Sequence, residues 1–405
     1  MIKKVLIFII FFIFIFGSIK GIRNGSPDFK VFYYASKLVY DADYLKIYFE
    51  SPDRYLYAPG FAWIIAPLAY FSYETAVYIW FFIKFITFTY FFVCFSKRFG
   101  AMATSLGVLF YVRPLLIDLK YGQVNQIIVC LLSVALIELY QPKAKVKRLL
   151  QWMSASVFSI SKIFPAVLLI IPFVSFFENV QKKDYQKSSL WAAIGILVGA
   201  MILFSIPFIS LSTHDFIQTY QDWIKALGAK GLPVETHNQS FLAFLMRVLF
   251  NVDTYSRVVG PYIQNYGFKV VQDVSVLKIW QLVFSLLSLG FILGTALSYS
   301  RKKVDKTILA ALAICFVPSY LVWKPYFIFG IPLAIVLMER TIRFNWVSQA
   351  RILFVTWIFL TFTSVHFIGA KATGWFEGWS FMLWLQLVLV GLSFRTPPLK
   401  QKVIS

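Results

Sequence analysis

Residues 190–209 read LWAAIGILVGAMILFSIPFI and contain no charged side chain. A helix needs roughly 20 apolar residues to cross the hydrocarbon core of a bilayer. Similar runs at residues 5–16, 76–95 and 277–297 recur along a chain that is 59% hydrophobic and 14% charged. The sequence therefore predicts an all-α polytopic membrane protein, with residues 1–405 forming one integral-membrane domain and no separate soluble domain.

Basic residues dominate the charge of the chain. The 39 Lys and Arg residues exceed the 18 Asp and Glu residues and give a net charge of +21. They lie in short clusters between the apolar runs, which argues against nucleic acid as a partner and favours contact with anionic membrane lipids. Because cytoplasmic loops retain Lys and Arg, the clusters predict about twelve crossings of the inner (plasma) membrane with both termini cytoplasmic. Two large outer loops, residues 23–59 and 210–275, follow from this orientation.

Two pairs of short apolar segments predict helical hairpins. Both ends of each pair adjoin basic clusters, so each tip, at Lys162 and at Lys324, is expected on the outer side. The four segments are residues 149–161, 164–177, 308–321 and 327–337. Residues 61–71 fit either a re-entrant helix or the start of the next span. Residues 352–368 and 375–392 predict the last two spans.

Asp28 is an acidic residue just beyond the outer end of the first predicted span. A carboxylate that is partly dehydrated by apolar and aromatic neighbours suits a general base. Asp is equally common as the N-cap of a helix, here a helix over residues 29–39. The two roles are compatible, and the residues alone leave both open.

Polar residues at the outer ends of other helices are candidates for substrate binding. Gln123, Asn125 and Gln126 open an apolar helix, and carboxamides donate and accept hydrogen bonds as sugar hydroxyls require. The alternative is a bridge between helices within the membrane. Lys162 can hold a phosphate as a compact positive charge, or it can extend to the membrane interface.

The second outer loop holds four more candidates, His237, Asn238, Gln239 and Arg247. The three histidines of the chain have no metal-ligand spacing, so His237 is expected to donate a hydrogen bond and no metal or other cofactor is expected. Arg247 is a second candidate for binding phosphate, with lipid headgroup contact as the alternative. The three cysteines lie in apolar runs and predict no disulfide.

Several short motifs occur in a fixed order along the chain. They are DFKVFYYA (residues 28–35), YAP (57–59), APL (66–68), GQVN (122–125), KIFP (162–165) and NQS (238–240), followed by Arg247. Together they resemble glycosyltransferase family 87 over most of residues 1–340. Members of that family are polyprenyl-phosphate-mannose-dependent α-mannosyltransferases with a GT-C fold and an active site facing the periplasm or cell exterior.

The resemblance implies roles for particular residues. Asp28 matches the catalytic base, and the carboxamide, Lys162 and Asn-Gln-Ser motifs match the lining of the donor and acceptor cavity, to which Tyr57 also belongs. One motif departs from the family. Many members carry a Trp followed by a His pair at the tip of a late hairpin, where this chain has Trp323-Lys324-Pro325-Tyr326. Lys324 is expected to contact a phosphate as a charge.

The expected reaction is an inverting displacement in which Asp28 deprotonates an acceptor hydroxyl. The hydroxyl attacks C1 of a hexose on a polyprenyl phosphate, and the resemblance implies that this hexose is mannose. Lys162, Arg247 and Lys324 would offset the charge of the leaving phosphate. The expected partners are this donor, a lipid or glycan acceptor, and membrane lipids. Two alternatives remain open: a lipid or solute transporter, and a ligase of the same fold that moves a lipid-linked glycan.

Overall fold

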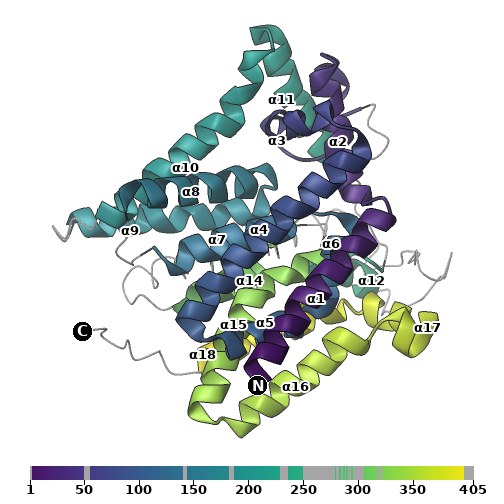
Figure 1. Ribbon diagram of the computed structural model, residues 1–405, viewed down its shortest axis with the longest axis vertical. Coiled ribbons are helices and arrows are strands. Elements are labelled where there is room, and N and C mark those ends of the chain that lie inside the picture. The colour runs from purple at the N-terminus through teal and green to yellow at the C-terminus, as the bar shows by residue number, and fades with distance from the viewer. Residues whose placement is uncertain are drawn as a thin grey trace. The chain divides into compact units, whose positions relative to one another are not determined.

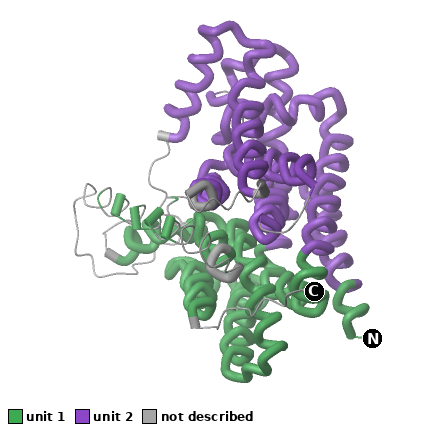
Figure 2. Tube along the Cα trace, turned by 90° about the vertical axis from the view of Figure 1, so that its left-hand side faces the viewer, with its two compact units in different colours: residues 1–7, 95–114, 232–405 green, residues 8–94, 115–231 purple. Residues whose placement is uncertain are grey.

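The computed structural model describes residues 2–49, 55–139, 144–181, 187–228, 236–249, 305–316, 319 and 322–395, with scattered positions between 279 and 294. Within these ranges the chain is helical and forms no strand (Figure 1). Two compact units are distinguished in Figure 2. Unit 1 comprises Met1–Ile7, Phe95–Pro114 and Leu232–Ser405, and unit 2 comprises Phe8–Cys94 and Leu115–Gly231. The expectation of one integral-membrane domain stays a prediction.

Unit 2 holds most of the first half of the chain. Its elements are α1 (Ile2–Arg23) from Phe8 onward, α2 (Pro27–Tyr40), η1 (Tyr44–Lys46), α3 (Pro59–Ile65), η2 (Ala66–Tyr70), α4 (Tyr73–Phe99) as far as Cys94, the end of α6 (Val112–Tyr121), α7 (Asn125–Ile137), α8 (Lys145–Ser161), η3 (Phe164–Leu169), α9 (Ile170–Gln181), α10 (Lys187–Ser205), η4 (Ile206–Ile209) and α11 (Thr213–Gly228).

Unit 1 holds the described residues of the second half together with two earlier segments, Met1–Ile7 and Phe95–Pro114. Its elements are α5 (Ala101–Phe110), the start of α6, α12 (Phe241–Leu249), α14 (Asp305–Ile314), η5 (Lys324–Gly330), α15 (Ile331–Phe344), α16 (Val347–Phe362), α17 (Val365–Gly378) and α18 (Phe381–Arg395).

Among the described residues, three helical segments are long and apolar enough to cross a membrane: Ile2–Arg23, Tyr73–Phe99 and Ser189–Ile209. Two bent pairs, α5 with α6 at 68° and α16 with α17 at 93°, raise this number to as many as five. These helices agree with a polytopic membrane protein. The total of about twelve crossings and the GT-C fold stay predictions, and the expected span at 276–297 lies mostly outside the described residues.

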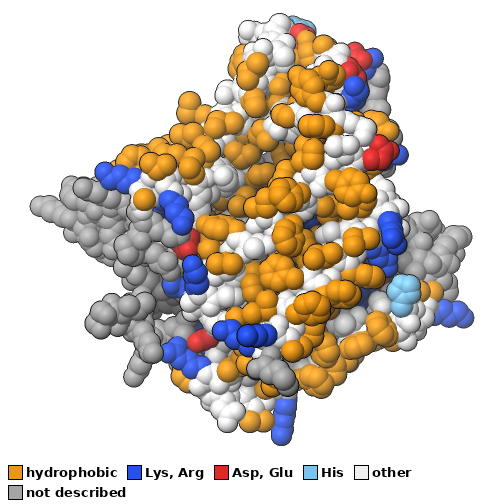
Figure 3. Space-filling view, in the orientation of Figure 1, with side chains coloured by type: hydrophobic (Ala, Val, Ile, Leu, Met, Phe, Trp, Pro, Cys, Tyr) orange, Lys and Arg blue, Asp and Glu red, His pale blue; other side chains and the backbone are white. Residues whose placement is uncertain are grey.

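The exposed faces of α1 and α4 are apolar, as hydrophobic side chains over these helices show in Figure 3. Phe8, Phe12 and Phe16 on α1 and Phe82 on α4 are each more than half exposed. A continuous apolar face of this kind is unfavourable in water and favourable in lipid. The surface of these two helices is therefore suited to the hydrocarbon of a bilayer.

Small residues set the close helix contacts of unit 2. Gly17 and Gly21 of α1 face α6, where a Cβ on Gly17 would lie 2.8 Å from side-chain carbons of Leu116 and Leu119. Gly195 of α10 faces α8, where a Cβ would lie 2.6 Å from the Leu149 carbonyl oxygen. Glycines four residues apart allow helix backbones to approach closely in membranes. The glycines of α1 thereby fix the end of α6, which carries a buried carboxylate described below.

The structure confirms the break predicted at the first hairpin, since α8 ends at Ser161 and η3 begins at Phe164. Of residues 61–71, the first ten belong to α3 and η2, and the last, Phe71, is extended and separates them from α4. They are therefore a short separate helix and not the start of the next span. Residues 23–59, the predicted outer loop one, also contain the 14-residue helix α2.

The predicted boundaries of the last two spans are wrong. Helix α16 ends at Phe362, and the chain bends by 93° before α17. Trp375 therefore belongs to α17, and the last helix begins only at Phe381. Ser380 has a positive φ of 49°, which ends the helical path. Both breaks occur within largely apolar sequence, where hydropathy alone gives no boundary.

Candidate active site

Asp28 lies in the first turn of α2 in unit 2, where Ser26 occupies the N-cap position. The alternative reading of Asp28 as the cap is therefore wrong, although its place near the positive end of the helix dipole still favours a carboxylate. Helix α2 buries Phe29, Phe32 and Ser36, which recur at helical spacing. This buried face holds the helix and leaves Asp28 partly exposed at its end.

The start of α2 is fixed by three contacts. The Tyr73 hydroxyl donates a hydrogen bond of 2.5 Å to the Gly25 carbonyl oxygen. The buried Ser26 hydroxyl donates to the Gly21 carbonyl oxygen at 3.0 Å. The Phe29 ring stacks on Trp80, with ring centroids 5.3 Å apart. The backbone that carries Asp28 is thus held from both sides of the turn between α1 and α2.

Trp80 also connects α2 to the turn that precedes α7. Its indole Nε1 donates to the Gly122 carbonyl oxygen at 2.8 Å. Gly122 has a φ of 68°, and a Cβ there would lie 2.9 Å from the Cβ atoms of Phe29 and Ser26. Glycine is required at this position for both reasons. The turn bearing Gln123 therefore packs directly on the residues that flank Asp28 in the sequence.

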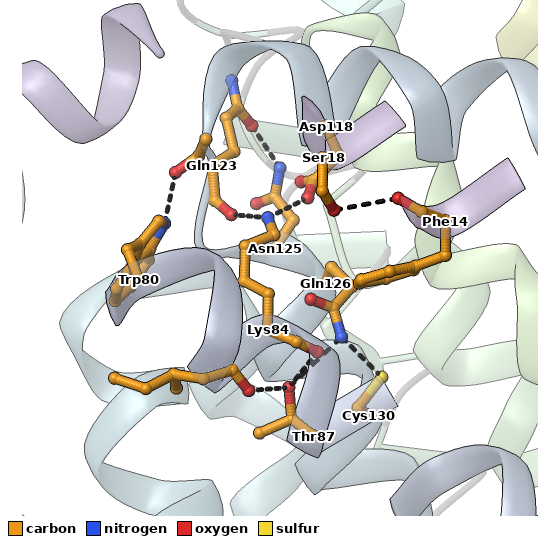
Figure 4. Close-up of polar contacts among 12 residues, drawn as sticks. Phe14, Ser18, Trp80, Lys84, Thr87, Asp118, Gln123, Asn125, Gln126 and Cys130 are labelled. Atoms are coloured by element: carbon orange, nitrogen blue, oxygen red, sulfur yellow. Dashed lines mark hydrogen bonds and ion pairs between the residues drawn. The ribbon is translucent and has the colours of Figure 1, made fainter. Parts of the chain in front are cut away.

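A buried ion pair supports the same turn (Figure 4). The Lys84 ammonium of α4 lies 2.7 Å from Asp118 Oδ1 of α6, and both side chains have 0% exposure. Lys84 also donates to the Gln123 carbonyl oxygen, and the Gln123 backbone N–H donates to the Asp118 carbonyl oxygen at 3.1 Å. The Asn125 amide in turn donates to Gln123 Oε1. The carboxamides of Gln123 and Asn125 are thus held in place by an ion pair whose two charges neutralise each other.

Lys162 completes this cluster at the end of α8. Its ammonium donates to Asn125 Oδ1 at 2.5 Å. The ammonium also lies 5.5 Å from the centre of the Tyr57 ring and 5.9 Å from that of Phe164, within cation–π range. Lys162 is partly exposed. It therefore presents a positive charge beside a carboxamide and two aromatic rings.

The turn that follows Lys162 is strained. Ile163 has φ 65° and ψ −65°, and the Phe164 N–H donates to the Lys162 carbonyl oxygen at 2.8 Å. This combination is the classic γ-turn, which is rare, and a positive φ is unusual for a β-branched residue. Backbone strain of this kind persists only where surrounding contacts hold it, and it concentrates at functional sites.

Loop one supplies the aromatic wall beside Lys162. The Ala58 N–H donates to the Ser161 carbonyl oxygen at 3.1 Å, which ties the end of loop one to the end of α8. Tyr57 stacks on Phe61 at 5.4 Å, and its carbonyl oxygen accepts a hydrogen bond of 3.0 Å from the Tyr48 hydroxyl. Burial raises the pKa of Tyr48 well above its usual value, so this phenol stays a neutral donor.

Unit 2 therefore brings four of the predicted residues into one cluster: Tyr57, Gln123, Asn125 and Lys162. Gln126 makes different contacts, because its amide donates to Thr87 Oγ1 at 3.3 Å and to Cys130 Sγ at 3.1 Å. These contacts fit the alternative of a bridge between helices.

In unit 1, the segment that carries Asn238 and Gln239 is buried and forms several hydrogen bonds with neighbouring backbone. Asn238 Oδ1 accepts from the backbone N–H groups of Ser240 and Val322, at 3.1 and 3.0 Å. The Gln239 N–H donates to the Val322 carbonyl oxygen at 2.7 Å, and its amide donates to the Glu377 carbonyl oxygen at 2.8 Å. These two side chains hold three segments of the chain together.

Arg247 ties the same segments from α12. Its Nε donates to the Gly378 carbonyl oxygen at 2.7 Å, Nη1 to the Asn238 carbonyl oxygen at 3.0 Å, and Nη2 to Ser380 Oγ at 2.8 Å. The side chain is only 2% exposed. A guanidinium used in this way stabilises the fold of unit 1, and this geometry favours a structural role over lipid headgroup contact.

Lys324 and His237 meet a carboxylate that the sequence did not single out. The Lys324 ammonium forms an ion pair with Glu377 Oε1, and His237 Nδ1 lies 3.7 Å from Glu377 Oε2. Burial lowers the pKa of Lys324, and the charge of Glu377 opposes that shift. Lys324 lies outside the candidate membrane spans.

Lys84, Asp118 and Glu377 were thus not predicted from the sequence. Lys84 and Asp118 carried a usable signal, because each is a charged residue within an apolar run, where a charge needs a partner. No pattern in the sequence links the two, which stand 34 residues apart. Glu377 lies in α17, beyond the motifs. Among the described residues, no group of three His, Cys, Asp or Glu side chains is placed to hold a metal ion.

The family model described as glycosyltransferase family 87 matches residues 55–325, about two thirds of the chain. The chain belongs to this family. The match confirms the resemblance drawn from the motifs, and it makes the protein a membrane glycosyltransferase that uses a sugar donor and an acceptor. The chain matches no curated protein and no solved structure. Tyr57, Lys162 and Lys324 lie within the matched residues, whereas Asp28 and Glu377 lie outside them.

Proposed function

We propose that this member of glycosyltransferase family 87 transfers a hexose, mannose in the first instance, from a polyprenyl phosphate to a lipid or glycan acceptor on the outer face of the cell membrane. Family membership supports transfer over transport. The observation that carries the proposal is the cluster in unit 2, where the Lys162 ammonium lies 2.5 Å from Asn125 Oδ1 and beside the Tyr57 ring.

This cluster has the groups that a sugar phosphate requires. Aromatic rings pack against the apolar faces of sugars, carboxamides bind their hydroxyls, and a lysine offers a compact charge to phosphate. Buried partners hold each of these groups, so little reorganisation is needed when charge develops on the leaving phosphate. A monophosphate carries less charge than a pyrophosphate, and the described part of this cluster offers it one partly exposed ammonium, that of Lys162.

Asp28 is the proposed general base. In the proposed step, the Asp28 carboxylate takes the proton of an acceptor hydroxyl, and the hydroxyl oxygen forms a bond to C1 of the sugar. The bond between C1 and the phosphate oxygen breaks at the same time, and the polyprenyl phosphate leaves with the electron pair. A single displacement of this kind inverts C1. The contacts through Phe29 and Trp80 support this assignment because they hold the start of α2 against the carboxamide turn.

The test is transfer from radiolabelled polyprenyl-phosphate-mannose to membrane lipid extract by purified wild type, Asp28→Asn and Asp41→Asn. Asp41 is a matched control, since it lies at the C-cap of the same helix in an exposed ion pair with Lys37. Loss of a positioned base costs roughly 10²- to 10⁴-fold in rate, so Asp28→Asn should lose that activity and Asp41→Asn should keep it.

Activity in both variants would refute the base assignment and leave the donor assignment standing. Wild type that transfers only from a polyprenyl pyrophosphate would replace the proposed donor with that of a glycan ligase. Wild type that is inactive with the monophosphate of every hexose tested would refute the proposed donor class.

A further inference from the structure

Three separate segments of unit 1 converge on Glu377. The Gln239 amide donates to the Glu377 backbone carbonyl oxygen at 2.8 Å, and the Gln239 N–H donates to Val322, two residues before Lys324, at 2.7 Å. Arg247 donates to the next carbonyl, that of Gly378, at 2.7 Å. The backbone on both sides of the ion pair is thus fixed by buried hydrogen bonds, independently of the ion pair itself.

The charges in this region do not balance. Lys324 and Arg113 both interact electrostatically with Glu377, which is the one carboxylate facing them in the described part of unit 1. Two other basic side chains also lie close to this carboxylate: His237 Nδ1 is 3.7 Å from Glu377 Oε2, and Arg247 donates to the Gly378 carbonyl oxygen. A buried excess of positive charge is unfavourable unless an anion joins it. The ligand chemistry that fits is a phosphate group.

The two carboxylate oxygens of Glu377 differ in their contacts. Oε1 accepts from Lys324, whereas Oε2 is buried and has no hydrogen-bond partner among the described residues. His237, whose Nδ1 lies 3.7 Å from Oε2, is 26% exposed. Lys324 is itself 13% exposed. The two basic side chains beside Glu377 are therefore partly accessible, whereas the carboxylate itself is buried.

We propose that Lys324 contacts the phosphate of a lipid substrate and that Glu377 is the positioning residue that keeps the Lys324 ammonium charged and aimed. This inference rests on the proposed use of a phosphate-bearing lipid. A lysine in an apolar setting loses its proton readily, and a fixed carboxylate beside it preserves the charge until a phosphate binds. Glu377 lies outside the residues that the family model matches.

The central test is the pH profile of Glu377→Gln. Glutamine keeps the shape and an oxygen that accepts a hydrogen bond, but it removes the charge that supports the ammonium. The alkaline limb of kcat/KM should therefore move to lower pH by about one unit or more, with activity recovered toward pH 7. In a Lys324→Arg background, Glu377→Gln should leave that limb unmoved, because arginine stays charged throughout this range.

Glu339→Gln is the matched control, because Glu339 is also in unit 1 and forms an ion pair with Arg343 at 3.5 Å. Its profile should coincide with that of wild type. An unmoved limb in Glu377→Gln would overturn the proposal. Equal loss of activity at every pH would also overturn it, because that result is expected of a purely structural role.

A binding measurement separates this inference from the proposed reaction. Farnesyl phosphate, a monoester without sugar, and phosphatidylglycerol, a diester, are titrated into the purified full-length protein between pH 7.5 and 10. Binding of farnesyl phosphate with the same Glu377-dependent limb would support a site for the donor phosphate, and binding of phosphatidylglycerol alone would assign the site to an acceptor-type lipid. Binding of neither lipid would overturn the inference. Sugar transfer by wild type, together with an alkaline limb that Glu377→Gln does not shift, would also overturn the inference but leave the proposed function intact.

Discussion

The burial of the ion pair between Lys84 and Asp118 leads to a quantitative prediction about the free energy of unfolding. The ammonium lies 2.7 Å from the carboxylate, and both side chains are fully buried. At an effective dielectric constant of about 20, the Coulomb attraction at this distance is about 6 kcal/mol. The cost of removing two charges from water offsets most of that attraction. The pair is therefore expected to contribute little net stability, although either charge alone is strongly destabilising.

The perturbations follow from this balance. Asp118→Asn leaves the Lys84 ammonium buried with the Gln123 carbonyl as its remaining partner, and it should reduce the free energy of unfolding by about 3–5 kcal/mol. Lys84→Met leaves the buried carboxylate without the ammonium that neutralises it and should cost a similar amount. The double variant Lys84→Met with Asp118→Leu removes both charges, so its loss should fall short of the sum of the single losses by at least about 2 kcal/mol.

The assay is unfolding of the purified protein in mixed micelles by increasing dodecyl sulfate, followed by tryptophan fluorescence. The control is Asp41→Asn, which breaks the exposed pair between Lys37 and Asp41 at 3.2 Å. An exposed pair contributes less than about 1 kcal/mol. The reasoning would be refuted if Asp118→Asn cost no more than Asp41→Asn, or if the losses in the double variant were additive.

Two further predictions concern helix packing and the leaving phosphate. Gly21→Leu should reduce the free energy of unfolding by at least about 2 kcal/mol, because a Cβ there would meet the Leu119 carbonyl oxygen. Gly391→Leu should be tolerated, because a Cβ there meets no atom within 4 Å outside the backbone of its own helix. Equal melting temperatures of the two variants would contradict this. Lys162→Met should lower kcat roughly 10²- to 10³-fold and Lys162→Arg should lose less, which a transfer assay at saturating donor measures; full activity of Lys162→Met would exclude it from charge stabilisation.

The positions of several helices of this chain could be predicted from the sequence. Long apolar runs predicted α1, α4 and α10 because period and hydropathy act locally. The break at Lys162 was also predicted, because Pro165 and a charge interrupt an apolar stretch there. The bend between α16 and α17 was missed, since residues of ordinary hydropathy surround it and the packing of unit 1 decides where the helix ends.

The candidate site divides in the same way. Ordered motifs alone were enough to indicate the family and to select Tyr57, Asn125 and Lys162, because the residue types that bind sugars and phosphates are few. The motifs did not indicate which charged residues form ion pairs with one another. The pairings of Lys84 with Asp118 and of Lys324 with Glu377 join residues 34 and 53 positions apart.

The sequence by itself therefore determined that the chain is a helical membrane glycosyltransferase with candidate polar residues at helix ends. Only the tertiary structure decided which charges are neutralised, because a buried charge is stable only beside a partner that the fold brings within about 4 Å. It also decided that Arg247 holds backbone carbonyls and that Gln126 bridges helices. Hydropathy and motif order depend on neighbours along the chain, whereas electrostatic pairing depends on neighbours in space.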